Sequence, residues 1–345
     1  MRGESAIDSR IMQKARLVHF TLFLSGALLA QSTDTGTAHK AAATALVNPN
    51  NAGIVNVACP AAIFPVPTYY PGGGGPPRAI GAPAGGGGGA ATTPARDTWY
   101  AEGGQVFDNL YLLTTKANNA WAVNTSAGII LIDTLFGYAA QDEIVDGLKK
   151  VGLDPANIKY IVVSHAHGDH DGSVKFLQDT YRPRIVMAPK DWELSARESS
   201  PPRRDIDATD GQKLTLGDTT ITIYITPGHT AGTLSLLVPV KDHGVPHLAM
   251  EWGGTAVSGN TSKEMLQSYI SNAARFLDIA EGAGADVIIG NHTIYNDALA
   301  RLARTKARKP GEPHPWVVGK AEVQKYLTVA EECAKSWLAI EDGRP

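Results

Sequence analysis

The stretch SHAHGDHDG, residues 164–172, places three histidines and one aspartate within six positions. It follows the apolar run IKYIVVS, residues 158–164, which is typical of a buried strand. A solvated polar loop is the simpler interpretation of such a cluster, and one half of a metal site is the alternative. The rest of the chain has to decide between them.

The spacing of these side chains suits a metal site. His165 and His167 are two positions apart, so they face the same side if the chain stays extended beyond the strand. Asp169 and His170 follow Gly168, where the chain can turn, so one short loop can offer ligands to two neighbouring points. Neutral imidazole and carboxylate are good zinc donors, and no thiolate lies nearby in the sequence. The cluster therefore favours a metal centre over a purely structural loop.

Two further histidines also follow strand-like segments. His229 stands in TPGHTAG, after a run that ends at Thr226, and His292 stands in IIGNHT, after the apolar run 287–290. Taken alone, either would be interpreted as an ordinary hydrogen-bonded polar residue, but beside the first cluster both are interpreted as ligands. We expect the histidines without such a context to lie on the surface: His39, His243, His247 and His314.

The pattern over residues 96–345 predicts one α/β domain with a helical extension at its C-terminal end. Strand-like runs lie at 106–115, 120–125, 128–134, 158–164, 184–188, 212–240, 247–253 and 285–292. Helical patterns lie at 140–152, 173–179, 262–281 and 321–340. Because meander, helix, strand and helix recur in both halves, we expect two packed β-sheets with helices outside.

The first 95 residues have a different composition. Basic residues precede the apolar run LVHFTLFLSGALLA, residues 17–30, so we predict a signal peptide over 1–30 and an exported protein, periplasmic or secreted. Residues 31–95 are rich in Ala, Gly, Pro and Thr, and we predict a disordered Gly/Pro-rich linker there. A misassigned start with a disordered tail, or a small separate domain, would be the alternatives.

Charge and cysteine content exclude several classes of function. The 345 residues carry 31 Lys and Arg against 34 Asp and Glu, without a basic stripe, so nucleic acid is not an expected partner. No apolar run is long enough for a membrane span, and the expected partner is a small-molecule substrate. Cys59 lies in the predicted linker, so we do not expect a defined disulfide with Cys333, although an oxidising compartment would permit one. Oligomeric state cannot be read from these features.

The histidine pattern resembles the metallo-β-lactamase fold superfamily. The resemblance rests on the His-x-His-x-Asp-His element, on the two later histidines and on GIILIDT upstream, and it covers about residues 97–305. It implies an αββα sandwich with two Zn²⁺ ions at one edge. It also implies two ligand sets: His165, His167 and His229 for the first zinc, and Asp169, His170 and His292 for the second.

One position departs from many members of that superfamily. Hydroxyacylglutathione hydrolases and acyl-homoserine lactonases have a metal-bridging Asp in a GDT element, whereas WGGTA, residues 252–256, places Gly254 there. Glu251 is three positions away and is interpreted as structural, and no Cys stands near this point as in thiolate-containing lactamases. His167 stands where redox relatives carry Glu, which argues against a di-iron centre. The remaining set resembles the lactamase subclass with a three-His site and an Asp-His-His site.

This resemblance implies a zinc-dependent hydrolase that opens the amide of β-lactam rings. Two zinc ions lower the pKa of a shared water to roughly 7, so that hydroxide attacks the carbonyl. Asp169 is expected to be catalytic as well as a ligand, by orienting the nucleophile or carrying a proton. Thr255 and Ser258 are candidate contacts for a substrate carboxylate. Hydrolysis of another ester, lactone or thioester on the same site is the main alternative, and a metal-binding scaffold without catalysis is a third.

Overall fold

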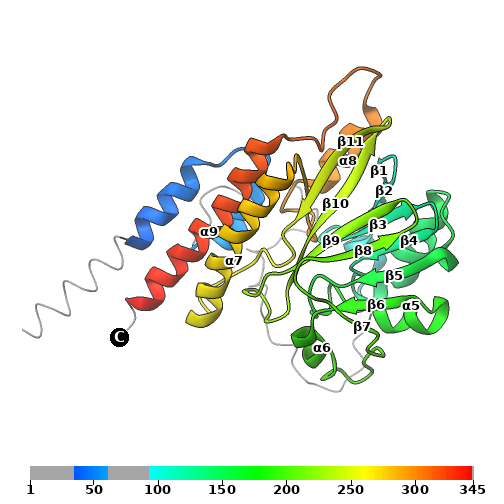
Figure 1. Ribbon diagram of the computed structural model, residues 1–345, viewed down its shortest axis with the longest axis horizontal. Coiled ribbons are helices and arrows are strands. Elements are labelled where there is room, and N and C mark those ends of the chain that lie inside the picture. The colour runs from blue at the N-terminus through cyan, green and yellow to red at the C-terminus, as the bar shows by residue number, and fades with distance from the viewer. Residues whose placement is uncertain (1–34, 61–92, 344–345) are drawn as a thin grey trace, which may run out of the picture.

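The computed structural model describes residues 35–60 and 93–343. Two β-sheets pack face to face, and helices cover the outer face of each sheet (Figure 1). This arrangement confirms the expected αββα sandwich. The predicted signal peptide, residues 1–30, and residues 31–34 and 61–92 of the predicted linker lie outside the described residues.

The first sheet combines an antiparallel meander with a parallel half. Strands β1 to β4 pair antiparallel in chain order, and β4 to β7 continue the sheet in parallel. The strands are β1 (Gly104–Phe107), β2 (Leu110–Thr114), β3 (Asn119–Thr125), β4 (Gly128–Ile132), β5 (Ile158–Val162), β6 (Arg184–Met187) and β7 (Ile206–Asp207). The run 106–115, expected as one strand, is instead a hairpin, because Asp108 and Asn109 form a two-residue turn between β1 and β2.

The second sheet is antiparallel except for one edge strand. Its spatial order is β12-β11-β10-β9-β8, and β12 runs parallel to β11. The strands are β8 (Gln212–Leu216), β9 (Thr219–Ile225), β10 (Leu234–Asp242), β11 (Val245–Glu251) and β12 (Val287–Ile289).

Alternation of side chains along the strands creates three buried layers. In β3, Trp121 and Val123 face the second sheet, whereas Ala120 and Ala122 face the helices on the other side. Both faces of the first sheet are therefore apolar, as expected when helices cover the parallel half.

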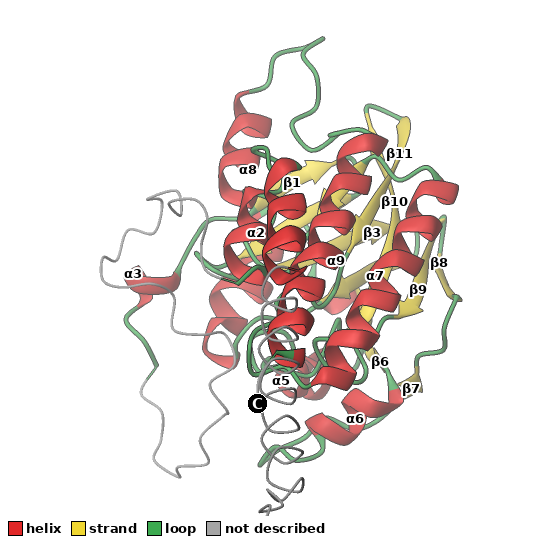
Figure 2. Cartoon of the chain, turned by 90° about the vertical axis from the view of Figure 1, so that its left-hand side faces the viewer, coloured by secondary structure: helices red, strands yellow, loops and turns green. Residues whose placement is uncertain are grey.

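Short helices cover the first sheet, and two long helices lie along the second. Those near the first sheet are α3 (Arg96–Trp99), η1 (Gly137–Ala139), the π-helical η2 (Ala140–Val145), α4 (Asp146–Lys150), η3 (Pro155–Asn157), α5 (Val174–Tyr181) and α6 (Pro189–Ser195). The others are α2 (Ala52–Ala58), α7 (Lys263–Ala283), α8 (Ala298–Ala307) and α9 (Lys320–Asp342). Helices α7 and α9 lie side by side along the second sheet (Figures 1 and 2). Among the described residues, no helix is long and apolar enough to cross a membrane.

The predicted linker requires a correction. Residues 35–45 are helical and α2 packs on α9, so residues 35–60 belong to the folded domain (Figure 2). Cys59 and Cys333 form a disulfide, which we did not expect. Ala and apolar residues spaced for one helical face, with Ile54, Val55 and Ala58 buried, stabilise this segment against α9. The composition of residues 31–95 did not reveal this helical pattern, because the glycine-rich run after residue 70 dominates that composition.

Candidate metal centre

Three histidine side chains converge at one edge of the sandwich. His165 and His167 lie in the loop after β5, and His229 lies in the loop between β9 and β10. Nε2 of His229 lies 3.1 Å from Nε2 of His165 and 3.1 Å from Nδ1 of His167. The structure thus brings together the three residues expected for the first metal, which we call the first group.

The second group consists of Asp169, His170 and His292. Nε2 of His170 lies 3.2 Å from Nε2 of His292 and 3.2 Å from Oδ2 of Asp169. His292 comes from the other sheet, directly after β12, so the site spans both sheets. The rings of His165 and His170 lie 4.1 Å apart between centroids, which makes the two groups neighbours.

Backbone carbonyls determine which nitrogen of the first group faces inward. Nδ1 of His165 donates to the carbonyl of Gly253 at 2.9 Å, and Nδ1 of His229 donates to the carbonyl of Ala256 at 2.6 Å. A neutral imidazole with a proton on Nδ1 has a lone pair on Nε2. Burial, as the largest cause, lowers the pKa of His229 to about 4 and that of His165 well below its usual value. Both rings are therefore neutral near pH 7.

This arrangement fits a cation. The Nε2 atoms of His165 and His229 are 3.1 Å apart, and with Nδ1 protonated on both rings neither Nε2 has a hydrogen to offer. Two lone pairs at that distance repel each other unless a positive charge lies between them. A metal ion ligated by imidazole nitrogen relieves this repulsion, and hydrogen bonds from the far nitrogen to carbonyl oxygens are the usual support for such ligands.

Asp133 orients His170 of the second group. Its carboxylate accepts hydrogen bonds from the backbone N–H of Ser164 at 2.7 Å, from the Ser164 hydroxyl at 2.7 Å, and from Nδ1 of His170 at 2.9 Å. Asp133 has a φ of 58°, a conformation that non-glycine residues rarely adopt and that turns the chain sharply after β4. Its position near the end of GIILIDT, residues 128–134, was a signal for this role that we did not use.

In the second group, neighbouring charges outweigh burial in setting the pKa values of Asp169 and His170. Burial alone would lower the pKa of His170, but the carboxylates of Asp169 and Asp133 and their hydrogen bonds raise it to about 10. Burial would raise the pKa of Asp169, but the charge of His170 outweighs that effect and holds it below its usual range. Burial, as the largest cause, lowers the pKa of His292 to about 3. The second group therefore holds an ionised carboxylate and one proton that a metal ion would replace.

Asn118 is a further polar residue at the second group that the sequence did not reveal. Its Nδ2 lies 2.9 Å from Oδ2 of Asp169 and 3.2 Å from Nδ1 of His292. The turn between β2 and β3 presents it, and this turn pairs with the chain around His292.

Gly254 has a different role from the one its sequence position suggested. A Cβ atom there would lie 2.5 Å from Cβ of His229 and 2.8 Å from Cγ2 of Thr233. Glycine thus lets His229 approach the end of β11 closely. Glu251 is fully buried, and burial, with a contribution from Asp133, raises its pKa well above the usual value. Neither carboxylate oxygen of Glu251 has a hydrogen-bond partner among the described residues, and the residue remains structural in our interpretation.

The remaining candidate residues lie in other settings. Thr255 is buried, and its hydroxyl donates to the carbonyl of Trp252 at 3.2 Å. Ser258 lies in a partly exposed turn, where its hydroxyl accepts from the backbone N–H of Asn260. Neither hydroxyl has a direct hydrogen bond to the six ligand candidates in the described part of the chain. His314 is buried against Phe107, with ring centroids 4.1 Å apart, so its expected surface position was wrong.

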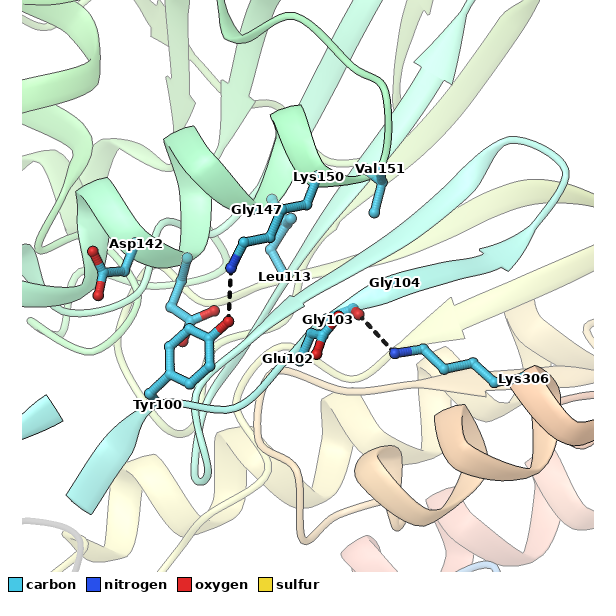
Figure 3. A pocket seen from close by; sticks show the side chains of 11 residues that line it. Tyr100, Glu102, Gly103, Gly104, Leu113, Asp142, Gly147, Lys150, Val151 and Lys306 are labelled. Carbon is cyan, nitrogen blue, oxygen red and sulfur yellow. Dashed lines mark hydrogen bonds between the residues drawn. The ribbon is translucent and has the colours of Figure 1, made fainter. Parts of the chain in front are cut away.

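A separate hollow of about 160 Å³ lies between the helices η2 and α4 and the start of β1 (Figure 3). Lys150 donates to the hydroxyl of Tyr100 at its rim, and Lys306 donates to the carbonyl of Gly103. Its lining includes Glu143 but none of the six ligand candidates. The hollow is therefore distinct from the metal centre.

Comparison with known proteins agrees with this geometry. The family model of the metallo-beta-lactamase superfamily matches residues 113–243, from β2 to the end of β10, and this stretch contains five of the six ligand candidates. The matched part of the chain belongs to the metallo-β-lactamase superfamily. The His-x-His-x-Asp-His element and the later histidines form two candidate metal-binding groups that are consistent with a dinuclear site.

Among solved metallo-β-lactamase folds, a subclass B3 metallo-beta-lactamase of Bradyrhizobium japonicum is 27% identical, with a TM-score of 0.56. The match covers 66% of this chain and 90% of that one. A metallo-beta-lactamase of Cronobacter sakazakii has a TM-score of 0.61 at 22% identity, covering 71% of this chain and all of that one; this likeness shows the fold alone.

Relatives found by sequence include lactonases, whereas the similar solved structures above are lactamases. An N-acyl homoserine lactonase of Azorhizobium caulinodans is 27% identical over 183 residues, 46% of this chain and 68% of the lactonase. One of Agrobacterium fabrum is 36% identical over 113 residues, 27% of this chain and 41% of that lactonase. Structure and sequence thus resemble enzymes with two different substrates.

Proposed function

We propose that this chain is a di-zinc hydrolase that opens the amide of β-lactam rings. The observation that carries the proposal is the pair of adjoining groups, one of three histidines and one of Asp-His-His, without a further carboxylate in either group among the described residues. Gly254 supports it, since the close approach of His229 leaves no room there for the bridging carboxylate expected of lactonases. The likeness to the subclass B3 enzyme of Bradyrhizobium japonicum supports the same substrate class.

Zinc is the metal that the donors favour. Five imidazoles and one carboxylate suit Zn²⁺, and three ligands per ion leave a position open, as catalytic zinc requires. Bound at both groups, zinc would lower the pKa of water and polarise the substrate carbonyl. His165, His167 and His229 would hold the first ion, and Asp169, His170 and His292 the second.

The protein's own groups prepare this chemistry. The carbonyls of Gly253 and Ala256 hold the rings of His165 and His229 with Nε2 inward, so neither of these rings needs to turn when metal binds. Asp169 is ionised and borders the space between the groups, with Asn118 as hydrogen-bond donor. Its carboxylate is the protein group placed to orient the nucleophile or to take a proton.

Aromatic side chains are better candidates than Thr255 for contact with the substrate. The rings of Phe136 and Tyr138 stack with centroids 5.2 Å apart, and Trp99 packs on Tyr138 at 5.2 Å. The hydroxyl of Ser173 donates to the carbonyl of Phe136 at 3.1 Å, so this aromatic segment lies against the chain that follows the second group's His170. We assign this aromatic wall to the apolar side chain of a substrate.

Hydrolysis of lactones is the second candidate. It is favoured by the matches to N-acyl homoserine lactonases, which include those of Azorhizobium caulinodans and Agrobacterium fabrum. Against it stands the absence of space for a carboxylate at Gly254.

Export is part of the proposal. The signal-like segment 1–30 motivates it, and the disulfide between Cys59 and Cys333 supports it, because disulfides persist mainly in oxidising compartments.

Steady-state hydrolysis by protein of measured zinc content tests the substrate. We expect turnover of a chromogenic cephalosporin that disappears in Asp169→Asn and persists in the surface variant Lys213→Gln. Turnover of acyl-homoserine lactones with no turnover of a cephalosporin, penicillin or carbapenem would overturn the β-lactam assignment. Hydrolysis of none of these classes by the zinc-loaded protein would favour the non-catalytic scaffold.

A further inference from the structure

His292 is the one member of the second group that does not belong to the loop after β5. Its segment, residues 291–293, is held by the turn between β2 and β3. The backbone N–H of Asn119 donates to the carbonyl of Asn291, and the N–H of Thr293 donates to the carbonyl of Ala117, both at 2.9 Å. The next residue, Ile294, lies against Gly53 in the N-terminal residues 35–60. The position of His292 thus depends on what packs behind it.

The N-terminal segment contacts the backbone that follows His292 directly at Gly53. A Cβ atom at Gly53 would lie only 1.7 Å from the carbonyl oxygen of Ile294, so the first turn of α2 lies directly against the backbone two residues beyond His292. Tyr295, the next residue, is buried and places its ring 4.8 Å from that of His292. Tyr295 and Ile54 of α2 belong to the same apolar cluster. A continuous path of packed atoms therefore joins α2 to the metal ligand.

A second contact links the N-terminal segment to the helix that follows His292. Arg301 on α8 is 1% exposed, and it donates to Oδ1 of Asn50 at 2.8 Å and to the carbonyl of Pro315 at 3.4 Å. Because a buried guanidinium is costly unless it is hydrogen-bonded, Asn50 stabilises α8 in its place. The N-terminal segment therefore supports both ends of the connection between His292 and α8.

The segment is itself locked to α9. The disulfide joins Cys59 to Cys333 across 274 residues of sequence. Nε1 of Trp337 donates to the carbonyl of Ala58 at 2.8 Å, and Nδ2 of Asn48 donates to Glu322 at 2.6 Å. These contacts extend along α9, so the segment cannot slide without breaking several of them.

We propose that residues 35–60 are a disulfide-locked clasp that positions His292 and thereby sets the affinity of the second metal group. The inference rests on the proposed metal centre. Asp169 and His170 have separate support from Asp133 and Asn118. The first group has no member on the connection from β12 to α8. Opening the clasp therefore weakens the second metal and leaves the first in place. Cys59, Cys333, Gly53 and Asn50 are positioning residues, since they act through His292.

Stepwise binding of Zn²⁺ to the metal-free full-length chain, measured by competition with a chromophoric chelator, tests the clasp. In Gly53→Ala, the new methyl group forces Ile294 to move, and we expect the second zinc to bind at least about 10-fold more weakly. The first zinc should bind within about 2-fold of the wild type. Gly282→Ala is the matched control, because Gly282 lies in α7 with nothing within 4 Å of the added atom.

The disulfide provides an independent arm that does not depend on the folding of the glycine variant. Wild-type protein, with Cys59–Cys333 opened by a reductant and the thiols then blocked, should lose second-zinc affinity in the same selective way. In the metal-free protein, amide hydrogen exchange over residues 292–298 should rise at least about 10-fold on reduction, while exchange over 164–172 stays constant. Equal weakening of both metals, or unchanged second-zinc affinity after complete reduction, would overturn the clasp. Failure of the wild type itself to bind two zinc ions would instead refute the proposed metal centre.

Discussion

The amide of Asn118 lies 2.9 Å from the carboxylate of Asp169, and the same nitrogen lies 3.2 Å from Nδ1 of His292. One side chain thus contacts two ligands that come from different sheets. Asn118 is itself held by its turn, because its backbone N–H donates to the hydroxyl of Thr115 at 2.9 Å. This contact holds Asp169 and His292 at a fixed separation in the metal-free protein.

Asn118→Ala should therefore weaken the second metal selectively. Loss of an outer hydrogen-bond partner typically costs metal ligands 10- to 100-fold in affinity, and we expect about that loss for the second zinc alone. Competition titration of the metal-free protein measures it. Asn124→Ala, in the partly exposed end of β3, is the control. Equal affinities in Asn118→Ala and in the wild type would show that the contact is incidental.

Asp133→Asn should impair the second group through the orientation of His170. The two oxygens of Asp133 receive only donors, from the N–H and the hydroxyl of Ser164 and from Nδ1 of His170. An amide presents an N–H to one of these donors, which creates a repulsive contact in a buried site. We expect kcat/KM to fall on the order of 100-fold with the protein still folded. Rates within 3-fold of wild type would contradict this role.

Gly254→Ala should remove metal from the first group. Its methyl group would meet Cβ of His229 at 2.5 Å, so His229 must move away from His165 and His167. Elemental analysis after dialysis should give about one zinc per chain, where we expect two for the wild type. A Gly254→Asp variant should fail in the same way, because it is limited by space before its charge matters. Full zinc content in both variants would mean that the backbone at the end of β11 can shift to accept a side chain, which would contradict this prediction.

Glu143 should make the stability of the protein depend on pH. Burial is the main cause that raises its pKa to about 8, against 4.5 in the unfolded chain. The folded state therefore holds a proton that the unfolded state releases, and the free energy of unfolding falls as the pH rises from about 4.5 to about 8. The loss due to this residue is at most about 5 kcal/mol, since a pKa difference of one corresponds to about 1.4 kcal/mol.

Glu143→Gln removes this ionisation and should flatten that part of the profile. Urea unfolding at several pH values between 5 and 8.5 measures it, with the exposed Glu102→Gln as control. The variant should gain on the wild type steadily as the pH rises from 5 to about 8, and the difference should level off above that pH. A parallel pH dependence in both proteins would assign the effect to other groups.

The sequence by itself determined the class of the fold and the six candidate ligands. Alternating apolar residues such as those of β3, and the apolar runs of β5 and β12, predict strands because their periodicity is local. The cluster of His165, His167, Asp169 and His170 within six positions is local as well, so it can be recognised from the sequence. The hairpin at Asp108 and the helices α6 and α8 were missed, because a two-residue turn and short helices leave weak periodic signals.

Tertiary structure alone decided the contacts that hold the ligands. Asn118 lies 51 residues from Asp169 and 174 from His292, and Cys59 lies 274 residues from its partner. No spacing rule connects residues at such separations; they meet only because two sheets pack and bring distant loops to one edge. Gly254 is the clearest case. Its sequence position suggested a missing carboxylate, whereas its surroundings show a backbone that must approach His229 too closely for any side chain.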